Sequence, residues 1–95
     1  MAIVVGLCTV DLSIPESYSL KDKRQVVRSL VEGLRNKFNV SASEVENLDK
    51  WRTATLAIAN VSNDARFCDQ VLSKVVDTIR SNPRVSLMDY EIEMV

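Results

Sequence analysis

The chain has 95 residues, a formal net charge of −1, and an ordinary balance of 46% hydrophobic and 26% charged residues. This size and composition predict one globular domain, residues 1–95, with a single hydrophobic core. The sequence contains no histidine, which excludes histidine-based acid–base catalysis and removes the commonest metal ligand. We therefore expect neither a metal nor another cofactor.

The first predicted element is a strand over residues 2–12. Both alternating sets of its side chains are largely apolar, which is typical of a strand at the centre of a sheet. No basic residue precedes it and Asp11 interrupts it, so it resembles neither a secretory signal nor a membrane span, and we expect a cytoplasmic protein. Its Cys8 and the distant Cys68 lie in apolar contexts, which favours buried, reduced thiols over a disulfide or a reactive cysteine.

A helix is predicted next, after a loop over residues 13–18. Ser19 is suited to cap its N-terminus, with Asp22 three residues later as a variant of the capping box, and Asn39 is suited to cap its C-terminus. Between these caps, apolar residues recur with the 3.6-residue period of a helix that packs on a core. They are Leu20, Val27, Leu30, Val31, Leu34 and Phe38.

The same segment, residues 19–41, concentrates positive charge. It holds six cations and two anions, so the remainder of the chain sums to −5. Four of the cations form a stripe beside the apolar one, within about 60° of one another on the helix. They are Lys21, Arg24, Arg28 and Arg35. Since a local positive field attracts an anionic surface such as RNA, these four are the candidate nucleic-acid-binding residues. The alternative is that they form an ordinary solvent-exposed helix surface that binds no ligand.

The start of this helix is a second place where an anion could bind, because backbone N–H groups are free there. Ser17, Tyr18 and Ser19 precede it, but Asp22 in the first turn competes for the same N–H groups. The loop before the helix contains no glycine. This disfavours the glycine-rich phosphate cradle of small phosphatases with a similar topology.

A weaker strand is predicted over residues 40–47, with Glu44 and Glu46 on one face and Val45 on the other, as in an edge strand. A hairpin loop follows over residues 48–52. Its Trp51 either packs under the sheet, which is the interpretation that we favour, or is exposed for recognition. Residues 53–61 are apolar on both faces and predict the second central strand.

A second helix is predicted after the capping residues 62–64, and Asn82 and Pro83 end it. Its apolar stripe consists of Phe67, Cys68, Val71, Leu72, Val75, Val76 and Ile79. Residues 84–95 alternate in polarity and predict the last strand. We expect its apolar side chains to point inward, namely Met88, Tyr90, Ile92 and Met94. We expect its acidic side chains to point outward, namely Asp89, Glu91 and Glu93.

The element order β-α-β-β-α-β predicts an α+β fold of the ferredoxin-like split βαβ type. In that fold a four-stranded antiparallel sheet carries both helices on one face, and the first and third strands are central. The uncovered face is then expected to be an apolar strip, with Gly6, Ala57 and Ala59 along it, between acidic edge strands. Outward-facing positions explain these carboxylates more simply than a divalent cation site does.

An uncovered apolar strip favours a homodimer that buries it. It does not favour RNA binding by the sheet itself, because the two central strands hold no aromatic residue on which bases could stack. We therefore expect any RNA contact to be made by the first helix.

Several segments together carry a family resemblance. The run S-L-K-D-K-R-Q-V-V-R-S-L at residues 19–30, then F-N-V-S at residues 38–41 and D-K-W-R-T-A-T-L at residues 49–56, resembles the bacterial YlxP family. The resemblance covers nearly the whole chain. One departure is the segment L-A-I-A at residues 56–59, where the family often has L-G-V-A. The matching residues are Ser19, Leu20, Lys21, Asp22, Lys23, Arg24, Val27, Arg28, Ser29, Leu30, Phe38, Asn39, Val40, Ser41, Glu44 and Trp51.

The resemblance implies a ferredoxin-like fold and a small cytoplasmic bacterial protein, and it brings no catalytic residues with it. Genes of the family often lie beside those for translation initiation factor two and ribosome-binding factor A, which implies a ribosome-associated or RNA-binding role. We therefore expect a non-enzymatic protein that binds ribosomal RNA or ribosome-assembly proteins through the basic stripe, and no membrane partner. A protein-interaction homodimer that uses the sheet face is the alternative, and an enzyme that uses Cys8 or the first loop is a third hypothesis.

Overall fold

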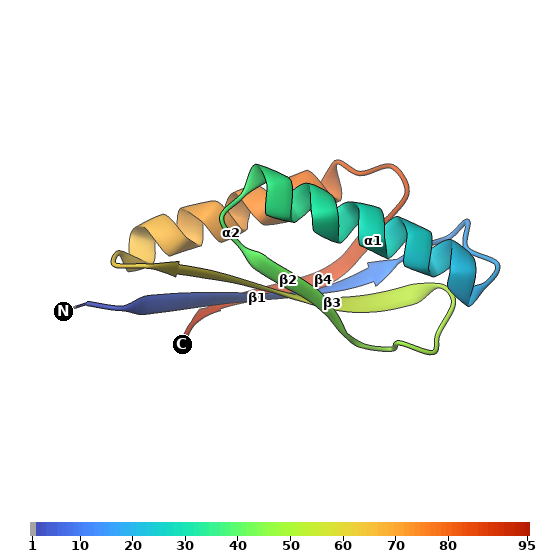
Figure 1. Ribbon diagram of the computed structural model, residues 1–95, viewed down its shortest axis with the longest axis horizontal. Coiled ribbons are helices and arrows are strands. Elements are labelled where there is room, and N and C mark those ends of the chain that lie inside the picture. The colour runs from blue at the N-terminus through green and yellow to red at the C-terminus, as the bar shows by residue number, and fades with distance from the viewer. Residues whose placement is uncertain (1) are drawn as a thin grey trace.

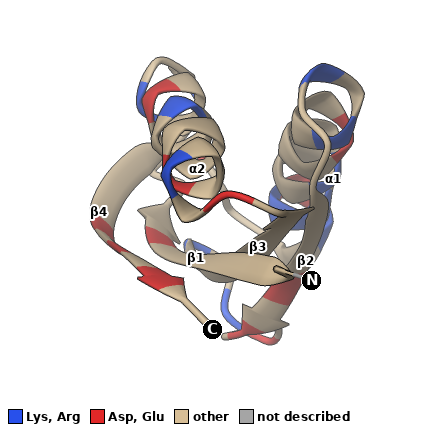
Figure 2. Ribbon diagram, turned by 90° about the vertical axis from the view of Figure 1, so that its left-hand side faces the viewer, with Lys and Arg blue, Asp and Glu red and all other residues tan. Residues whose placement is uncertain are grey.

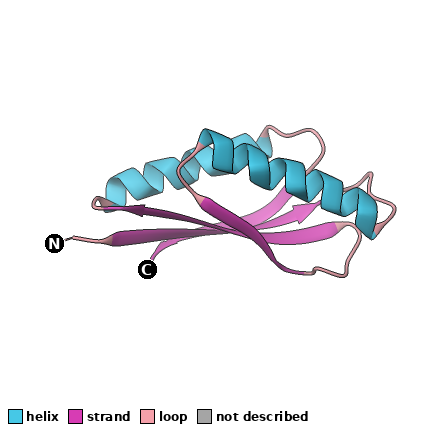
Figure 3. Ribbon diagram, viewed as in Figure 1, coloured by secondary structure: helices cyan, strands magenta, loops and turns pink. Residues whose placement is uncertain are grey.

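Six elements follow one another in the predicted order in the computed structural model, which describes residues 2–95. They are β1 (Val4–Ser13), α1 (Leu20–Lys37), β2 (Ser41–Glu46), β3 (Thr53–Ser62), α2 (Ala65–Arg80) and β4 (Ser86–Met94). The strands form one antiparallel sheet in the order β2-β3-β1-β4, so β1 and β3 are central. Both helices cover the same face of this sheet (Figures 1 and 3). The predicted ferredoxin-like fold is thereby confirmed.

Capping residues fix where α1 begins and ends. The Ser19 hydroxyl accepts a hydrogen bond from the Asp22 N–H (3.0 Å), as expected for an N-cap. The Asp22 carboxylate reaches back to the N–H of Tyr18 (3.0 Å), one residue before the position that a capping box uses. The C-cap is Phe38 rather than the predicted Asn39. Asn39 instead accepts a hydrogen bond at its carbonyl from the buried side chain of Asn60 (2.8 Å).

The hydrophobic core lies between the helices and the sheet. Each helix buries one apolar stripe against the strand residues that point to the same side. The largest apolar side chains with almost no exposure are Leu12, Ile14, Leu34, Leu56, Ile58, Leu72 and Ile79. Two details differ from the prediction: Val26 joins the buried stripe of α1, and Phe67 in the first turn of α2 is 52% exposed.

Two β-bulges change which side chains face the helices. The pairing of β1 with β4 shifts register between Asp11 and Leu12, and that of β2 with β3 shifts between Glu44 and Glu46. A bulge leaves one extra residue unpaired and re-aims the side chains around it. The extra residue in β4 is Met88, which is 65% exposed rather than inward as predicted.

Gly6 on β1 also differs from its predicted place on the open face. It is buried beneath α2, where a Cβ atom would lie 2.8 Å from Leu72 Cδ1 and 3.3 Å from Cys68 Cβ. The glycine therefore allows α2 to approach β1 closely. Within residues 2–95, no helix combines the length and the hydrophobicity needed to cross a membrane.

Candidate nucleic-acid interface

Charge is divided between the two layers of the fold, as Figure 2 shows by colour. The four strands contain six carboxylates and no lysine or arginine. The two helices contain nine cations and four carboxylates. The helix layer is therefore the cationic side of the molecule, although the whole chain is slightly acidic.

Three of the four predicted binding residues gather on one exposed face of α1. Lys21, Arg24 and Arg28 are exposed, and together with Gln25 they line a shallow hollow of about 220 Å³. No carboxylate lines this hollow. None of the three cations lies in an ion pair with another residue of the range 2–95. We call Lys21, Arg24 and Arg28 the basic stripe from here on.

Arg35, the fourth predicted residue, has a different setting. Its guanidinium donates a hydrogen bond to the carbonyl of Ala42 on β2 (2.7 Å), while the residue remains exposed. β2 is an edge strand, and a covered carbonyl at an edge is less available for pairing with another chain. The contact also shows that this side of α1 overhangs the β2 edge of the sheet.

Lys23, a fifth cation of the same helix, is not available to a ligand. Its side chain has 0% exposure, and its ammonium group lies 2.8 Å from a carboxylate oxygen of Glu44. The ammonium also donates to the backbone carbonyls of Asn47 (2.7 Å) and Thr53 (3.1 Å). Lys23 therefore fastens both ends of the β2–β3 loop beneath α1.

The ion pair with Lys23 corrects the predicted position of Glu44. Glu44 pairs with the buried Leu56 and turns toward the helices, whereas Glu46 pairs with Thr55, whose hydroxyl bonds to Asp11 (2.9 Å). Directly paired residues project to the same face of a sheet, so the bulge between the two glutamates places them on opposite faces. The prediction that they share one face is wrong.

Two exposed aromatic side chains lie where the β1–α1 loop meets the β2–β3 loop. Trp51 is 56% exposed and Tyr18 is 69% exposed. Arg52 connects the two loops. Its Nε donates a hydrogen bond to the carbonyl of Ser17 (2.9 Å), and its guanidinium lies 5.0 Å from the centre of the Tyr18 ring. The favoured prediction that Trp51 packs under the sheet is therefore wrong, and its alternative, an exposed aromatic, is correct. Tyr18 was not predicted as a site residue, although an aromatic directly before a helix cap was a usable signal.

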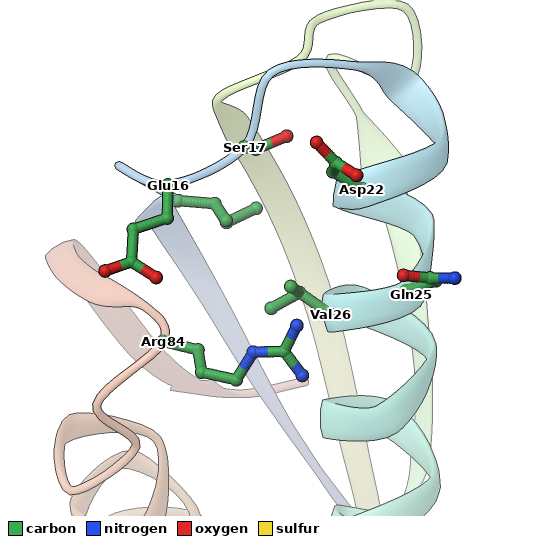
Figure 4. A pocket seen from close by; sticks show the side chains of 7 residues that line it. Glu16, Ser17, Asp22, Gln25, Val26 and Arg84 are labelled. Atoms are coloured by element: carbon green, nitrogen blue, oxygen red, sulfur yellow. The ribbon is translucent and has the colours of Figure 1, made fainter.

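Side chains of the chain itself occupy part of the anion site considered at the start of α1. Asp22 takes the N–H of Tyr18, and the Ser19 hydroxyl takes the N–H of Asp22. Beside these residues, a cleft of about 190 Å³ separates α1 from the α2–β4 loop, and Arg84 extends across it toward Val26 (Figure 4). Carboxylates of Glu16 and Asp22 line the same cleft, so it offers an anion no uniformly positive surface.

The two cysteines are buried and are not bonded to each other. Burial raises the pKa of the Cys8 thiol to about 11, so this thiol stays protonated at neutral pH. Cys68 lies 3.1 Å from the side-chain oxygen of Asn60, a donor distance for a weak S–H bond inside the core. Among residues 2–95, no group of three or more potential metal ligands comes together.

The open face of the sheet differs from the prediction in its borders. An apolar strip does run along it, formed by Val5 and Leu7 of β1 and Ala57, Ala59 and Val61 of β3. Along the β4 side the strip is bordered by the carboxylates of Glu91 and Glu93, which pair with Thr9 and Leu7. Along the β2 side it is bordered by the serines that pair with the two alanines, Ser41 and Ser43. The acidic rim is therefore on one side only, and it continues at one end through Asp11, Asp89 and Glu46.

Comparison with known proteins gives the fold and the relatives of this chain. A de novo designed protein, Foldit4, superposes with a TM-score of 0.53 over 98% of this chain and 96% of its own, at 10% identity, which supports the fold alone. The uncharacterized protein YlxP of Bacillus subtilis (strain 168) is 33% identical over 82 residues, covering 86% of this chain and 89% of that protein. The profile of a family described as a protein of unknown function, DUF503, matches residues 5–92. The chain therefore belongs to the DUF503 family, and its resemblance to the YlxP proteins is confirmed.

Proposed function

We propose that this protein acts by binding RNA, in the setting of ribosomal RNA or a ribosome-assembly complex, through the basic stripe of α1. The observation that carries the proposal is the hollow lined by Lys21, Arg24 and Arg28, with only the amide of Gln25 between them. No carboxylate lines the hollow, and within residues 2–95 none forms an ion pair with these three cations, so their charges are available to phosphate. Phosphate contacts supply most of the affinity of nucleic-acid binding. The gene neighbourhood of YlxP proteins directs the proposal to the ribosome rather than to another RNA.

The division of charge between the layers supports the same orientation. An RNA strand that approaches the sheet meets the carboxylates of Glu91, Glu93 and Asp89 on β4, which repel phosphate. One that approaches the helices meets an excess of cations. The long-range field therefore turns α1, rather than the sheet, toward the RNA.

Binding without catalysis is part of the proposal. The chain offers no histidine, and its Cys8 thiol is held protonated by burial. Phosphate contacts from lysine and arginine position a strand and give affinity, but they read no sequence. We therefore propose a protein that contributes affinity and geometry to a complex.

Reversing two charges of the basic stripe tests the proposal. We expect the double variant Arg24→Glu, Arg28→Glu to bind a labelled fragment of ribosomal RNA at least about tenfold more weakly, because two attractive interactions with phosphate become repulsive. The slope of log affinity against log salt should fall by about 0.7 for each phosphate of a single strand that the variant no longer neutralises. Fluorescence anisotropy at several salt concentrations measures both. Since both side chains are exposed, the unfolding free energy should change by no more than about 1 kcal/mol per site.

A matched control is the double variant Arg66→Glu, Lys74→Glu, which changes the net charge equally but on exposed positions of α2. It should bind RNA nearly as well as the unaltered protein. Reversal of Asp89 and Glu91 to lysine should leave binding equal or slightly stronger. Equal weakening in the α1 and α2 variants would mean that net charge, and not the basic stripe, controls binding, and the proposal would fail.

A homodimer that pairs the open sheet faces is the second candidate, because Val61 on that face is 61% exposed. Sedimentation at micromolar concentration should then give a species near twice the chain mass of 10.7 kDa. The variant Ala57→Asp, which places a charge on the apolar strip, should shift it toward the monomer, whereas Ala65→Asp at an exposed position of α2 should not. A monomer at high protein concentration would contradict this candidate.

A further inference from the structure

We infer that the end of the molecule where α1 begins is a stacking platform for unpaired bases, so that the ligand of the basic stripe is a single-stranded RNA segment. The platform consists of Tyr18 in the β1–α1 loop and Trp51 in the β2–β3 loop, together with Arg52, which follows Trp51 and bonds to the β1–α1 loop. This inference rests on the proposed function and names the class of RNA that the same surface takes.

Exposure of the two rings is the first observation. Tyr18 is 69% exposed and Trp51 is 56% exposed, which makes them the two most exposed of the five aromatic residues of the chain. Phe67 (52%) and Tyr90 (45%) are also exposed, but they lie apart from these loops, on α2 and β4. Large aromatic side chains contribute more to stability when they are buried, so two exposed rings at one end of a domain indicate a recognition surface. Unpaired bases stack on such rings and on the planes of arginine guanidinium groups.

Both loops are held in place before any ligand arrives. Lys23 bonds to the carbonyls of Asn47 and Thr53, at the two ends of the β2–β3 loop. Arg52 ties this loop to the β1–α1 loop through its bond to the Ser17 carbonyl, and the N–H of Ile14 bonds back to the carbonyl of Arg52 (2.8 Å). A platform ordered in advance loses little conformational entropy on binding.

The Tyr18 ring is oriented by the same contact. The Arg52 guanidinium lies over the ring at 5.0 Å from its centre, yet Tyr18 as a whole remains exposed to solvent. A guanidinium fixed in this way adds a positive charge beside the place where a base would stack. The phosphate of the stacked nucleotide could then contact the Arg52 guanidinium without rearrangement of the loop.

Position relative to the basic stripe is the last observation. The β1–α1 and β2–β3 loops lie at the end of the molecule where α1 begins, as Figure 1 shows, and Lys21 follows Tyr18 by three residues. The contact of Arg35 with Ala42 shows that the neighbouring side of α1 overhangs β2, the strand that leads into the β2–β3 loop. From Lys21 to Arg28 the helix rises about 10 Å, the length of about three stacked nucleotides. A strand can therefore stack its bases at the loops and lay its phosphates along the stripe.

Titration of the protein with a short single-stranded RNA, and with the duplex of the same sequence, tests the inference. Trp51 is the only tryptophan of the chain, so its fluorescence reports on the platform alone. We expect the single strand to quench Trp51 emission and the duplex to leave it unchanged, because paired bases are not free to stack on the protein. The single strand should also bind more tightly than the duplex.

Variants separate stacking from charge. Tyr18→Ala should weaken single-strand binding by about 5- to 150-fold, the range for removal of one stacked base, with the salt slope unchanged. Tyr18→Phe and Trp51→Phe retain a ring and should bind nearly normally, whereas Trp51→Ala should bind as weakly as Tyr18→Ala. As all these side chains are exposed, the fold should tolerate each change.

The outcomes distinguish this inference from the proposed function. Equal binding of single strand and duplex, with unchanged Trp51 emission and full affinity in Tyr18→Ala, would overturn the stacking platform and leave phosphate binding by the basic stripe intact. Absence of binding to either RNA would overturn both. Weaker binding by Tyr18→Ala that Tyr18→Phe fails to restore would also overturn stacking, since the hydroxyl and not the ring would then be responsible.

Discussion

Replacing Lys23 with methionine is expected to lower the unfolding free energy by about 3 kcal/mol. The substitution keeps most of the buried volume but removes the charge that lies 2.8 Å from Glu44, and it takes the hydrogen-bond donor from the carbonyls of Asn47 and Thr53. Breaking a buried ion pair on one side costs about 3–5 kcal/mol, because the remaining charge is left without a partner. Glu44 retains 14% exposure, which places the expected decrease at the lower end of that range. Urea denaturation followed by circular dichroism measures it.

Two controls make this prediction specific to the ion pair. The double variant Lys23→Met, Glu44→Leu should recover much of the missing stability, since it removes both charges together. Lys21→Met, two residues away on the exposed face, should change the unfolding free energy by less than about 0.5 kcal/mol. A decrease below about 1 kcal/mol for Lys23→Met alone would contradict the assignment of Lys23 as a structural residue.

Replacing each of the two glycines of the chain with a larger residue is expected to change the unfolding free energy in opposite directions. Gly6→Val should lower the unfolding free energy by about 2–3 kcal/mol, because overpacking of a dense core is costly. Even the first added carbon would lie 2.8 Å from Leu72 Cδ1 and 3.3 Å from Met94 Cε. Gly33→Ala should raise it by about 1 kcal/mol, because Gly33 lies in the interior of α1 with no atom within 4 Å of its missing Cβ.

Neither glycine has a positive φ, so the contrast between them comes from space and helix propensity. Thermal denaturation of the two variants beside the unaltered protein measures the difference. A Gly6→Val protein as stable as the unaltered one would mean that α2 does not approach β1 as closely as the structure places it.

The element order, the central strands and the fold were predictable because they depend on periodicity alone. Continuous apolar runs marked β1 and β3, and 3.6-residue stripes marked both helices. The errors concern the face of the sheet to which a side chain points, because strand pairing in the folded protein determines that face. The bulges that turn Met88 and Glu44 to new faces depend on which strands pair and in what register, and nothing in the two segments themselves specifies it.

The candidate site was predictable to a similar extent. Helical phase correctly placed Lys21, Arg24 and Arg28 on an exposed face, but the hollow among their side chains depends on side-chain conformations that the sequence does not specify. Helical phase also separates Lys23 from them, as the predicted stripe did, because Lys23 is spaced by four and seven residues from the buried Val27 and Leu30. The exposure of Trp51 could not be read from the sequence, since it depends on how Lys23 and Arg52 hold the hairpin loop.

Co-sedimentation of the protein with purified ribosomal subunits at two salt concentrations tests RNA binding by the basic stripe most directly. We predict that the unaltered protein sediments with a subunit at about 50 mM salt and is largely released at about 200 mM, as counterion release requires for phosphate contacts. The variant Arg24→Glu, Arg28→Glu should remain in the supernatant at both concentrations, while Arg66→Glu, Lys74→Glu should behave like the unaltered protein. Retention that is independent of salt, or that survives reversal of Arg24 and Arg28, would contradict a role for the basic stripe in RNA binding.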